Sequence, residues 1–332
     1  MTWTEADVRF MRRAIELSKN GFPAPNPHVG CVIVKGGEVI GEGWHEYAGA
    51  AHAEVAALKG IGANGAEAYV SLEPCNHQGR TGPCSVALIE AGVKRVVYAC
   101  SDPNPKAVGG GERLRQAGIQ VQSGLLEEEA RQANEQFFFA LEHKRPIIVL
   151  KAACSLDGRI ALTNGESKWI TGEAARHQAH RLRAELGAVL VGRKTVEQDD
   201  PELTARIEGV TNQPTRIVLD PSGKLKGREK VFNQAAPTVH ITGAIDLQDL
   251  VASLFEQNIT GLLVEGGAQT ISGFLKANLH DRLELFLAPK ILGTGPTWPE
   301  GFPLTSLKEA PTWQIIQTQQ LGQDLWLTAT PT

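Results

Sequence analysis

Three residues in the first third of the chain could hold a metal ion: His52, Cys75 and Cys84. One imidazole and two thiols can hold a tetrahedral Zn²⁺ on three sides and leave its fourth position for water. Glu54 follows His52 by two residues, close enough to move a proton of that water without becoming a ligand. A histidine, a glutamate two residues later and two Pro-Cys pairs form the pattern of zinc-dependent deaminases. The sequence therefore predicts hydrolytic removal of an amine.

The same residues could instead have a purely structural role. Each cysteine taken alone could be a small apolar filler of the core. A structural zinc site would need a fourth ligand, for which Cys31 and His77 are available. Cys31 lies in an apolar strand pattern, whereas His77 lies between the two cysteine ligands and suits a substrate contact at least as well. We therefore favour an open, catalytic metal site.

The segment between the two cysteines is unusually long. Eight residues separate Cys75 from Cys84, whereas compact zinc-deaminase motifs place two there. This segment adds hydrogen-bond donors and the guanidinium of Arg80 beside the metal, which suits a substrate that carries an anionic group. An ordinary surface loop with one arginine is the alternative.

Length, composition and charge limit the classes of protein to which this chain can belong. The chain has 332 residues, enough for two domains, and its 42% hydrophobic and 21% charged residues are ordinary for a globular protein. A net charge of −4 gives no basic field for nucleic acid or an anionic membrane, and we expect neither partner. We find no signal peptide and no apolar span of membrane length. The five cysteines are an odd set, which suits metal ligands and buried thiols in a cytoplasmic enzyme.

The first half of the chain must position the metal ligands. Thr4 and Asp7 resemble a capping box before a helix, which a proline-rich loop ends at residues 21–27. Strands are expected at 29–34, 39–44, 68–72, 95–99 and 119–123, and helices at 51–58, 84–91, 111–117 and 127–142. This alternation predicts a three-layer α/β domain, in which helices cover both faces of a mixed sheet.

A charged, proline-marked joint at residues 143–146 separates the two halves. We place the boundary at residue 145, with one domain at 1–145 and the other at 146–332. Strands are expected at 147–153, 188–191, 215–219, 238–241, 261–264, 283–288 and 324–328, and helices from 171 to about 186 and at 270–277. The second half is therefore also expected to form an α/β sheet.

Two features of the second half could do chemistry. Lys151 lies in an apolar strand pattern, and burying an ammonium is costly unless it is paired or functional. Gly266 and Gly267 open a helix whose first amides could hold a phosphate, although a plain tight turn accounts for the pair equally well. No G-x-G-x-x-G stands between a strand and a helix in this half, which disfavours a Rossmann fold. The glycines at 109–111 are interpreted as a turn.

The motifs together resemble those of the bifunctional riboflavin-biosynthesis deaminase/reductase family, over essentially the whole chain. In the first half they are PNPHVGC (25–31), GWH (43–45), HAE (52–54), LEPCNHQGRTGPC (72–84) and DPNP (102–105). In the second half they are Lys151 with SLDGR (155–159), GESKWIT (165–171), TVEQDDP (195–201), EGG (265–267) and APK (288–290).

This resemblance implies two consecutive reactions on a small phosphorylated pyrimidine. The N-terminal domain, similar in fold to cytidine deaminases, would deaminate 2,5-diamino-6-(5-phosphoribosylamino)pyrimidin-4(3H)-one with Zn²⁺. The C-terminal domain, similar to dihydrofolate reductase, would use NADPH to reduce the ribosyl group to ribityl, giving 5-amino-6-(5-phosphoribitylamino)uracil. The main alternative is a monofunctional deaminase with a catalytically silent, ligand-binding second domain. A nucleic-acid-editing deaminase and a zinc-stabilised binding module are less favoured alternatives.

The resemblance also implies site residues. It makes His52, Cys75 and Cys84 the zinc ligands and Glu54 the proton shuttle. Contacts to the pyrimidine and its phosphate would come from Asn26, His45, His77 and Arg80. In the reductase the catalytic residues would be Lys151 and Asp199, and the substrate contacts Ser167, Arg183, Asp200, Leu203, Arg206 and Glu265. NADPH contacts would come from Cys154, Trp169, Thr195, Asp199, Gly266, Gly267, Ala268, Gln269 and Thr270.

Some details of this site are open. Lys151 is expected to face Asp199, although residues 199–201 could instead form a simple turn. The ring of Trp169 could equally belong to the core. We also expect a homo-oligomer, a dimer or a tetramer, because both folds commonly pair through sheet edges or helix faces.

Overall fold

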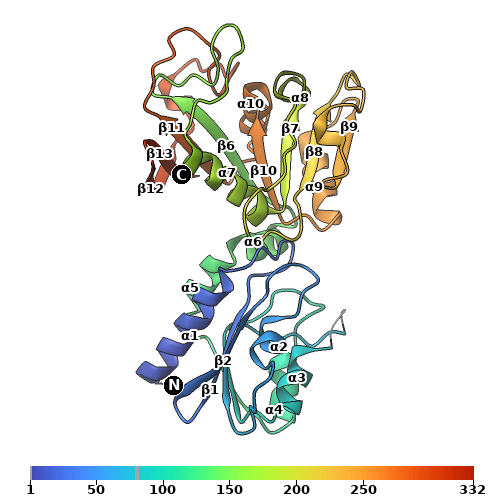
Figure 1. Cartoon of the computed structure of the whole chain (residues 1–332), viewed down its shortest axis with the longest axis vertical. Coiled ribbons are helices and arrows are strands. Elements are labelled where there is room, and N and C mark those ends of the chain that lie inside the picture. Colours follow the sequence, from blue (N-terminus) through green and yellow to red (C-terminus); the bar gives the residue numbers. More distant parts are fainter. Residues whose placement is uncertain (1, 79–81) are drawn as a thin grey trace. The chain divides into compact units, whose positions relative to one another are not determined.

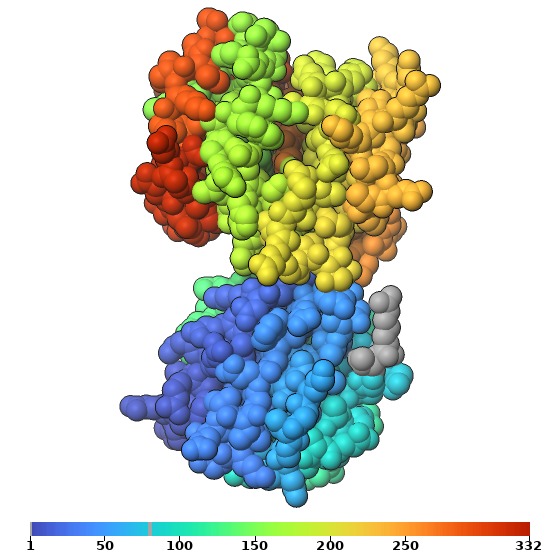
Figure 2. Space-filling model, viewed as in Figure 1, coloured from blue at the N-terminus to red at the C-terminus, as the bar shows by residue number. Residues whose placement is uncertain are grey.

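The structure is a computed structural model that describes residues 2–78 and 82–332 (Figure 1). The chain divides into two compact units, residues 1–143 and 144–332, each built around its own sheet. The space-filling view shows one face of each unit, with a hollow between the green and the yellow part of unit 2 (Figure 2). No helix in these described residues is long and apolar enough to cross a membrane.

Unit 1 is a three-layer α/β domain. Its five-stranded sheet has the order β2-β1-β3-β4-β5, with β1 antiparallel to both neighbours and β3, β4 and β5 parallel. The strands are β1 (Gly30–Lys35), β2 (Glu38–Trp44), β3 (Glu67–Leu72), β4 (Arg95–Cys100) and β5 (Gln120–Ser123). The helices are α1 (Glu5–Ser18), α2 (Ala53–Ala57), α3 (Cys84–Glu90), α4 (Gly110–Gln116), α5 (Glu127–Ala133) and α6 (Glu135–His143).

Alternating strand residues build a core on each face of this sheet. Val32 of β1 packs with Phe10 of α1 and Phe138 of α6, whereas its neighbour Ile33 packs on the other face with Leu88 of α3 and Leu114 of α4. This alternation follows from the two-residue period of a strand. One face therefore carries α1, α5 and α6, and the other carries α2, α3 and α4, two of which bring metal ligands.

The predicted capping box at the start of α1 is confirmed. The hydroxyl of Thr4 accepts a hydrogen bond from the amide of Asp7, and the Asp7 carboxylate accepts one from the amide of Thr4. The same carboxylate, 4% exposed, also accepts hydrogen bonds from Arg95 and from the hydroxyl of Tyr69, both at 2.7 Å. Asp7 therefore ties α1 to β3 and β4 at a distance from the metal ligands.

The prediction of a single helix at 127–142 is wrong. The structure ends α5 at Ala133 and begins α6 at Glu135. Asn134 lies between them, and its side chain accepts a hydrogen bond from the amide of His28 at 2.6 Å and donates one to the carbonyl of His28 at 2.7 Å. A tertiary contact thus breaks the helix where the sequence shows no proline or glycine.

Unit 2 contains an eight-stranded sheet of order β12-β13-β11-β6-β10-β7-β8-β9. The strands are β6 (Ile147–Ser155), β7 (Ala188–Gly192), β8 (Thr215–Asp220), β9 (Thr238–Thr242), β10 (Gly261–Gly266), β11 (Arg282–Ala288), β12 (Trp313–Leu321) and β13 (Asp324–Pro331). The helices are α7 (Glu173–Leu186), α8 (Arg193–Asp199), α9 (Leu247–Glu256) and α10 (Ala268–Lys276), with short 3-10 helices η1 (Lys230–Phe232) and η2 (Leu307–Glu309). The strands from β11 to β9 run parallel, and β13 and β12 add an antiparallel edge.

Two α-helices and one strand of unit 2 have no counterpart in the sequence prediction: α8, α9 and β12. The two short 3-10 helices, η1 and η2, were not predicted either. For α9 a signal exists, because Asp246 caps the helix and Leu250, Val251 and Leu254 form its buried side. β12 is an exposed edge strand rich in glutamine, so it lacks the apolar alternation of a half-buried strand. The central strands β6, β7 and β10 are buried almost throughout, as parallel strands covered on both faces must be.

Candidate active sites

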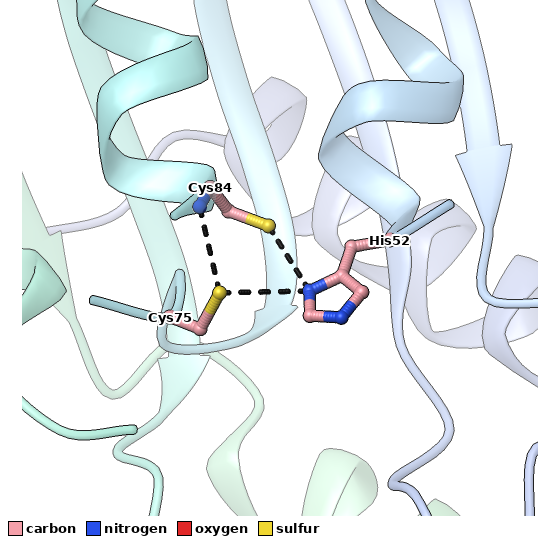
Figure 3. Close-up of side chains that lie close together, drawn as sticks. All are labelled: His52, Cys75 and Cys84. Atoms are coloured by element: carbon pink, nitrogen blue, oxygen red, sulfur yellow. Dashed lines mark hydrogen bonds between the residues drawn. The ribbon is translucent and has the colours of Figure 1, made fainter. Parts of the chain in front are cut away.

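The three predicted metal ligands come together in unit 1 (Figure 3). His52 is the residue before α2, Cys75 lies in the loop after β3, and Cys84 is the first residue of α3. One ligand atom from each residue lies within 4.8 Å of the other two. No fourth His, Cys, Asp or Glu of the described chain joins this group, so Cys31 and His77 do not complete a structural zinc site.

The distances within this group fit a zinc ion. Nδ1 of His52 lies 3.2 Å from Sγ of Cys84 and 3.5 Å from Sγ of Cys75. Around a tetrahedral Zn²⁺, with bonds of about 2.0 Å to nitrogen and 2.3 Å to sulfur, such pairs are separated by roughly 3.5 Å. Hydrogen bonding from Cys84, joined by hydrogen bonding from His52, outweighs burial and lowers the pKa of Cys75, which favours the thiolate that binds metal.

Glu54 lies in the first turn of α2, two residues after His52, and is 3% exposed. Burial raises the pKa of its carboxyl to about 6, and the charge of Cys75 adds to this effect. A carboxyl group with a pKa near neutrality can both accept and release a proton at the pH of the cell. Its place beside the ligands, but outside the ligand group, suits the predicted proton shuttle.

Two predicted substrate contacts, Asn26 and His45, lie against each other. Nδ1 of His45 is 3.0 Å from the carbonyl oxygen of Ala51, to which it donates, and this fixes the tautomer with a lone pair on Nε2. The side-chain amide of Asn26 lies 3.1 Å from that Nε2. The His45 ring also packs edge-on against His52, with centroids 5.3 Å apart. His45 therefore lies directly beside the ligand His52, and Asn26 lies beside His45; their contact with the substrate stays a prediction.

The segment between the cysteine ligands is described in part. Nδ1 of His77 is buried and has no hydrogen-bond partner in the described part of the chain. A buried ring nitrogen without a partner suits a group that awaits a ligand. Arg80, the other predicted contact of this segment, lies outside the described residues.

A half-buried group of three charged side chains lies in unit 2. Val264 of β10 is in register with Leu150 of β6, so Glu265 and Lys151 follow side by side on neighbouring parallel strands. Nζ of Lys151 lies 3.8 Å from the Glu265 carboxylate, and Arg183 of α7 makes two hydrogen bonds to the same carboxylate, at 2.5 and 2.8 Å. Burial lowers the pKa of Lys151, whereas Arg183 and Lys151 outweigh burial and lower the pKa of Glu265 to about 2.

The start of α10 lies close to the end of β7 and to α8. A Cβ on Gly192, at the end of β7, would lie 2.5 Å from the hydroxyl of Thr270 in α10. A Cβ on Gly267, which caps α10, would lie 3.2 Å from the hydroxyl of Thr195 in α8. Gly266, with φ of +120°, borders open space. The first amides of α10 have no acceptor within the helix, so this open, glycine-lined end of β10 fits a cofactor phosphate.

Comparisons with known proteins cover both units. A family profile described as "RibD C-terminal domain" matches residues 146–327, and one described as "Cytidine and deoxycytidylate deaminase zinc-binding region" matches residues 4–100. The riboflavin biosynthesis protein RibD of Aquifex aeolicus is 44% identical over 347 residues, which cover 97% of this chain and 97% of that protein. The solved structure of Acinetobacter baumannii RibD superposes with a TM-score of 0.90 at 40% identity and covers 99% of each chain.

The chain belongs to the RibD family. A further solved member of similar structure, from Thermotoga maritima, is named a diaminohydroxyphosphoribosylaminopyrimidine deaminase/5-amino-6-(5-phosphoribosylamino)uracil reductase. It has a TM-score of 0.89 at 37% identity and covers 98% of this chain and 99% of its own. This membership confirms the predicted fold, a cytidine-deaminase-like unit followed by a reductase unit similar to dihydrofolate reductase. Nothing in the comparisons supports the monofunctional alternative.

One expected contact of the RibD reductase site is wrong. Lys151 does not face Asp199, because its ion pair is with Glu265. Asp199 instead ends α8, where its carboxylate accepts a hydrogen bond from Ser167 at 3.3 Å and its carbonyl accepts one from Lys168 at 2.8 Å. The register of β6 and β10 decides the partner of Lys151, and a single sequence does not reveal that register.

The remaining predicted reductase residues differ in exposure. Trp169 is not a core residue: it is 63% exposed, and its ring packs under the guanidinium of Arg176. Cys154 and Leu203 are buried, at 1% and 2% exposure.

Asp200 adopts a left-handed conformation and accepts a hydrogen bond from the amide of Lys230. Residues 199–201 thus form the end of a helix rather than a simple turn. Ala268 and Gln269 open α10 beside Gly267.

The prediction missed His180 of α7. Its Nδ1 lies 3.0 Å from the carbonyl of Thr204 and 3.3 Å from the amide of Arg206, and the guanidinium of Arg183 lies 3.4 Å from the same atom. His180 thus links two predicted substrate-binding arginines. The sequence could have indicated this contact. Residues three apart on a helix are neighbours, and His180 precedes the predicted substrate-binding Arg183 by three positions.

Proposed function

We propose that this chain catalyses two consecutive steps of riboflavin biosynthesis, zinc-dependent deamination in unit 1 and NADPH-dependent reduction in unit 2. The observation that carries the proposal is the presence of two separate groups of functional side chains in one chain that covers its RibD relatives almost completely. One is the group of His52, Cys75 and Cys84 with Glu54 beside it. The other is the Lys151–Glu265–Arg183 group.

For deamination, we assign the diamino pyrimidine ring with its phosphoribosyl group as substrate. His52, Cys75 and Cys84 would hold Zn²⁺, which when bound lowers the pKa of water to about 7. Glu54 would take one proton from the attacking water and pass it to the ring nitrogen, and would then transfer the remaining proton of that water to the departing amine, which leaves as ammonia. Its carboxylate is buried and follows the ligand His52 by two residues. Asn26, His45 and His77 bind the substrate, and Arg80 carries a charge suited to its phosphate.

For reduction, NADPH supplies the hydride when bound. The open end of β10 at Gly266 and Gly267 receives a cofactor phosphate, together with the amides of Ala268, Gln269 and Thr270. Thr195, Asp199, Cys154 and Trp169 line the rest of the cofactor site. Lys151 lies near the reacting sugar, where Glu265 keeps its half-buried ammonium paired. Ser167, Arg183, Asp200, Leu203 and Arg206 complete the substrate contacts.

The test supplies the purified protein with the diamino pyrimidine and NADPH, and follows ammonia release and NADPH oxidation separately. Both signals are expected, and the deaminated intermediate alone should support NADPH oxidation. Ammonia release without any NADPH oxidation, even with the intermediate supplied, would leave only the deaminase assignment. NADPH oxidation without ammonia release would leave only the reductase.

We also propose that the protein works in the cytoplasm as a homo-oligomer, a dimer or a tetramer. Its five cysteines are free and buried, as expected in a reducing compartment. The edge strand β12 exposes Ile315 and Ile316, at 58% and 56%, and an exposed edge of this kind favours pairing. Sedimentation at micromolar concentration should give at least twice the chain mass of 35.7 kDa, and a monomer would contradict the proposal.

A further inference from the structure

The long segment between Cys75 and Cys84 raises a question of geometry. In a compact motif with two intervening residues, the cysteines occupy neighbouring positions and the chain itself sets their spacing. Here eight residues intervene, and a loop of that length leaves its ends many accessible separations. Something other than the local chain must therefore hold Cys75 opposite Cys84 and His52.

The residues on either side of Cys75 are held by a distant segment. The side chain of Glu73, which is 7% exposed, accepts hydrogen bonds from the amides of Gly109 and Gly111, at 3.3 and 3.0 Å. The amide of Asn76 donates to the carbonyl of Ala107 at 2.9 Å. These contacts place residues 107–111, which follow the metal ligands by more than twenty positions, directly against the Cys75 loop.

A second set of contacts joins the Cys75 loop to α3, the helix that begins with Cys84. The side-chain oxygen of Asn76 accepts hydrogen bonds from Ser85 of α3 and from Arg113 of α4, both at 3.1 Å. The amide of Ser85 donates to the carbonyl of Cys75 at 3.2 Å. Asn76 therefore bridges the two helices that flank the loop, and it fixes Cys75 relative to Cys84.

The approach of the distant segment is close enough to require glycine. A Cβ on Gly110 would lie 1.7 Å from the carbonyl oxygen of Pro74 and 2.8 Å from its carbon. These are backbone atoms, so neither could move aside without moving the residue before Cys75. Gly109 is in the left-handed region, with φ of +100°, as it turns the chain into α4.

We propose that Glu73 is a positioning residue for the metal site, which acts with Asn76 and the start of α4 to hold Cys75 in ligand geometry. The proposal rests on the assignment of His52, Cys75 and Cys84 as zinc ligands. It makes the glycines at 109–111, interpreted from sequence as a turn, part of the support of the metal site. Groups that orient metal ligands from outside typically contribute 10- to 100-fold in affinity or activity.

The test replaces Glu73 by Ala and by Gln in the full chain. Zinc affinity is measured by competition with a chromophoric chelator, and ligand geometry by the visible absorption of the Co²⁺-substituted protein. Glu73→Ala is expected to weaken zinc binding by about 10- to 100-fold, to change the cobalt spectrum and to lower kcat for deamination more than it changes KM. Glu73→Gln, which keeps an acceptor oxygen, should recover most of each property.

A matched control separates positioning from plain stability. Asp7→Asn also removes a buried carboxylate that accepts hydrogen bonds in unit 1, but Asp7 lies against Arg95 and Tyr69 rather than the Cys75 loop. It should lower stability and leave zinc affinity and the cobalt spectrum unchanged. NADPH oxidation on the deaminated intermediate should be unchanged in every variant, because the residues assigned to reduction belong to unit 2.

Three outcomes decide the proposal. Wild-type zinc affinity and cobalt absorption in Glu73→Ala would overturn it, even if stability falls. If Glu73→Ala does not fold, Asn76→Ala decides in its place, with an expected loss of zinc affinity of about tenfold; unchanged affinity and spectrum there would overturn it. A wild-type protein that binds no zinc would instead refute the proposed deaminase function itself.

Discussion

The two sites of this chain are assembled in different ways. In unit 1 the ligands and Glu54 lie within residues 52–84, at the starts of two helices and in one loop. In unit 2 the charged group joins Lys151, Arg183 and Glu265, which span more than a hundred positions. The register of β6 and β10 brings Lys151 to Glu265, and α7 brings Arg183 to the same carboxylate. The contacts within a site built from local motifs can be predicted from the sequence. The contacts within a site built from strand pairing can be identified only once the fold is known.

This comparison predicts first that the two activities respond separately to metal removal. Dialysis against a strong chelator should abolish ammonia release and leave NADPH oxidation on the deaminated intermediate nearly unchanged, because the metal group lies wholly in unit 1. Adding back Zn²⁺ should restore deamination. Parallel loss of both activities would show that the sites depend on each other.

Glu54→Gln should give the next largest effect. The amide keeps the shape of the side chain but cannot take up the proton, so kcat for deamination should fall by about 10²- to 10⁴-fold. Zinc content should stay near one ion per chain, since Glu54 lies outside the ligand group. Ammonia release and metal analysis on the same preparation check both statements, and substantial deamination by the variant would remove Glu54 from the proton path.

Lys151→Met should produce the reverse pattern. Loss of the ammonium beside Glu265 is expected to lower NADPH oxidation by about 100-fold, within the range for a positioned acid or base, and to leave ammonia release unchanged. A matched variant, Lys168→Met, removes an exposed lysine that donates a hydrogen bond to the backbone of Asp199 and should change the rate far less. Equal effects of the two variants would argue against a special role for Lys151.

The smallest expected effect is that of Asp7→Asn on the stability of unit 1. Burial acts to raise the pKa of Asp7, but hydrogen bonds from Arg95, Tyr69 and Thr4 outweigh it and hold that pKa well below the ordinary value. Because the folded-state pKa is depressed, the ionised group contributes stability above about pH 4, which is lost as the pH falls further. Asp7→Asn should therefore destabilise unit 1 by about 1–3 kcal/mol at pH 7, and by less towards pH 2.

Hydrogen exchange followed by mass spectrometry can measure this difference on peptides from residues 1–143. Peptides from residues 144–332 serve as an internal control, since Asp7 belongs to unit 1. A difference between wild type and variant that stays constant from pH 7 to pH 2 would contradict the role assigned to the ionised carboxylate.

The sequence predicted features that depend on interactions between residues close together in the chain, and it missed features that depend on distant residues. The metal group, the capping box at Thr4 and most strands of both sheets were predictable, because each leaves a local pattern in residue type or spacing. The break at Asn134 was not, since it depends on the backbone of His28, which lies more than a hundred residues away. The roles of Glu73 and Asn76 were hidden for the same reason: their partners lie in residues 85–113.

The pairing of Val264 with Leu150 limits how the gene for this chain can change in length. Adding or removing one codon within β10 would turn Glu265 towards the opposite side of the sheet and leave the Lys151 ammonium enclosed without its counter-charge. Such a frame-preserving change would harm folding and hydride chemistry together. Insertions are therefore expected to accumulate in the connections between strands, and the interior of β10 should keep its length.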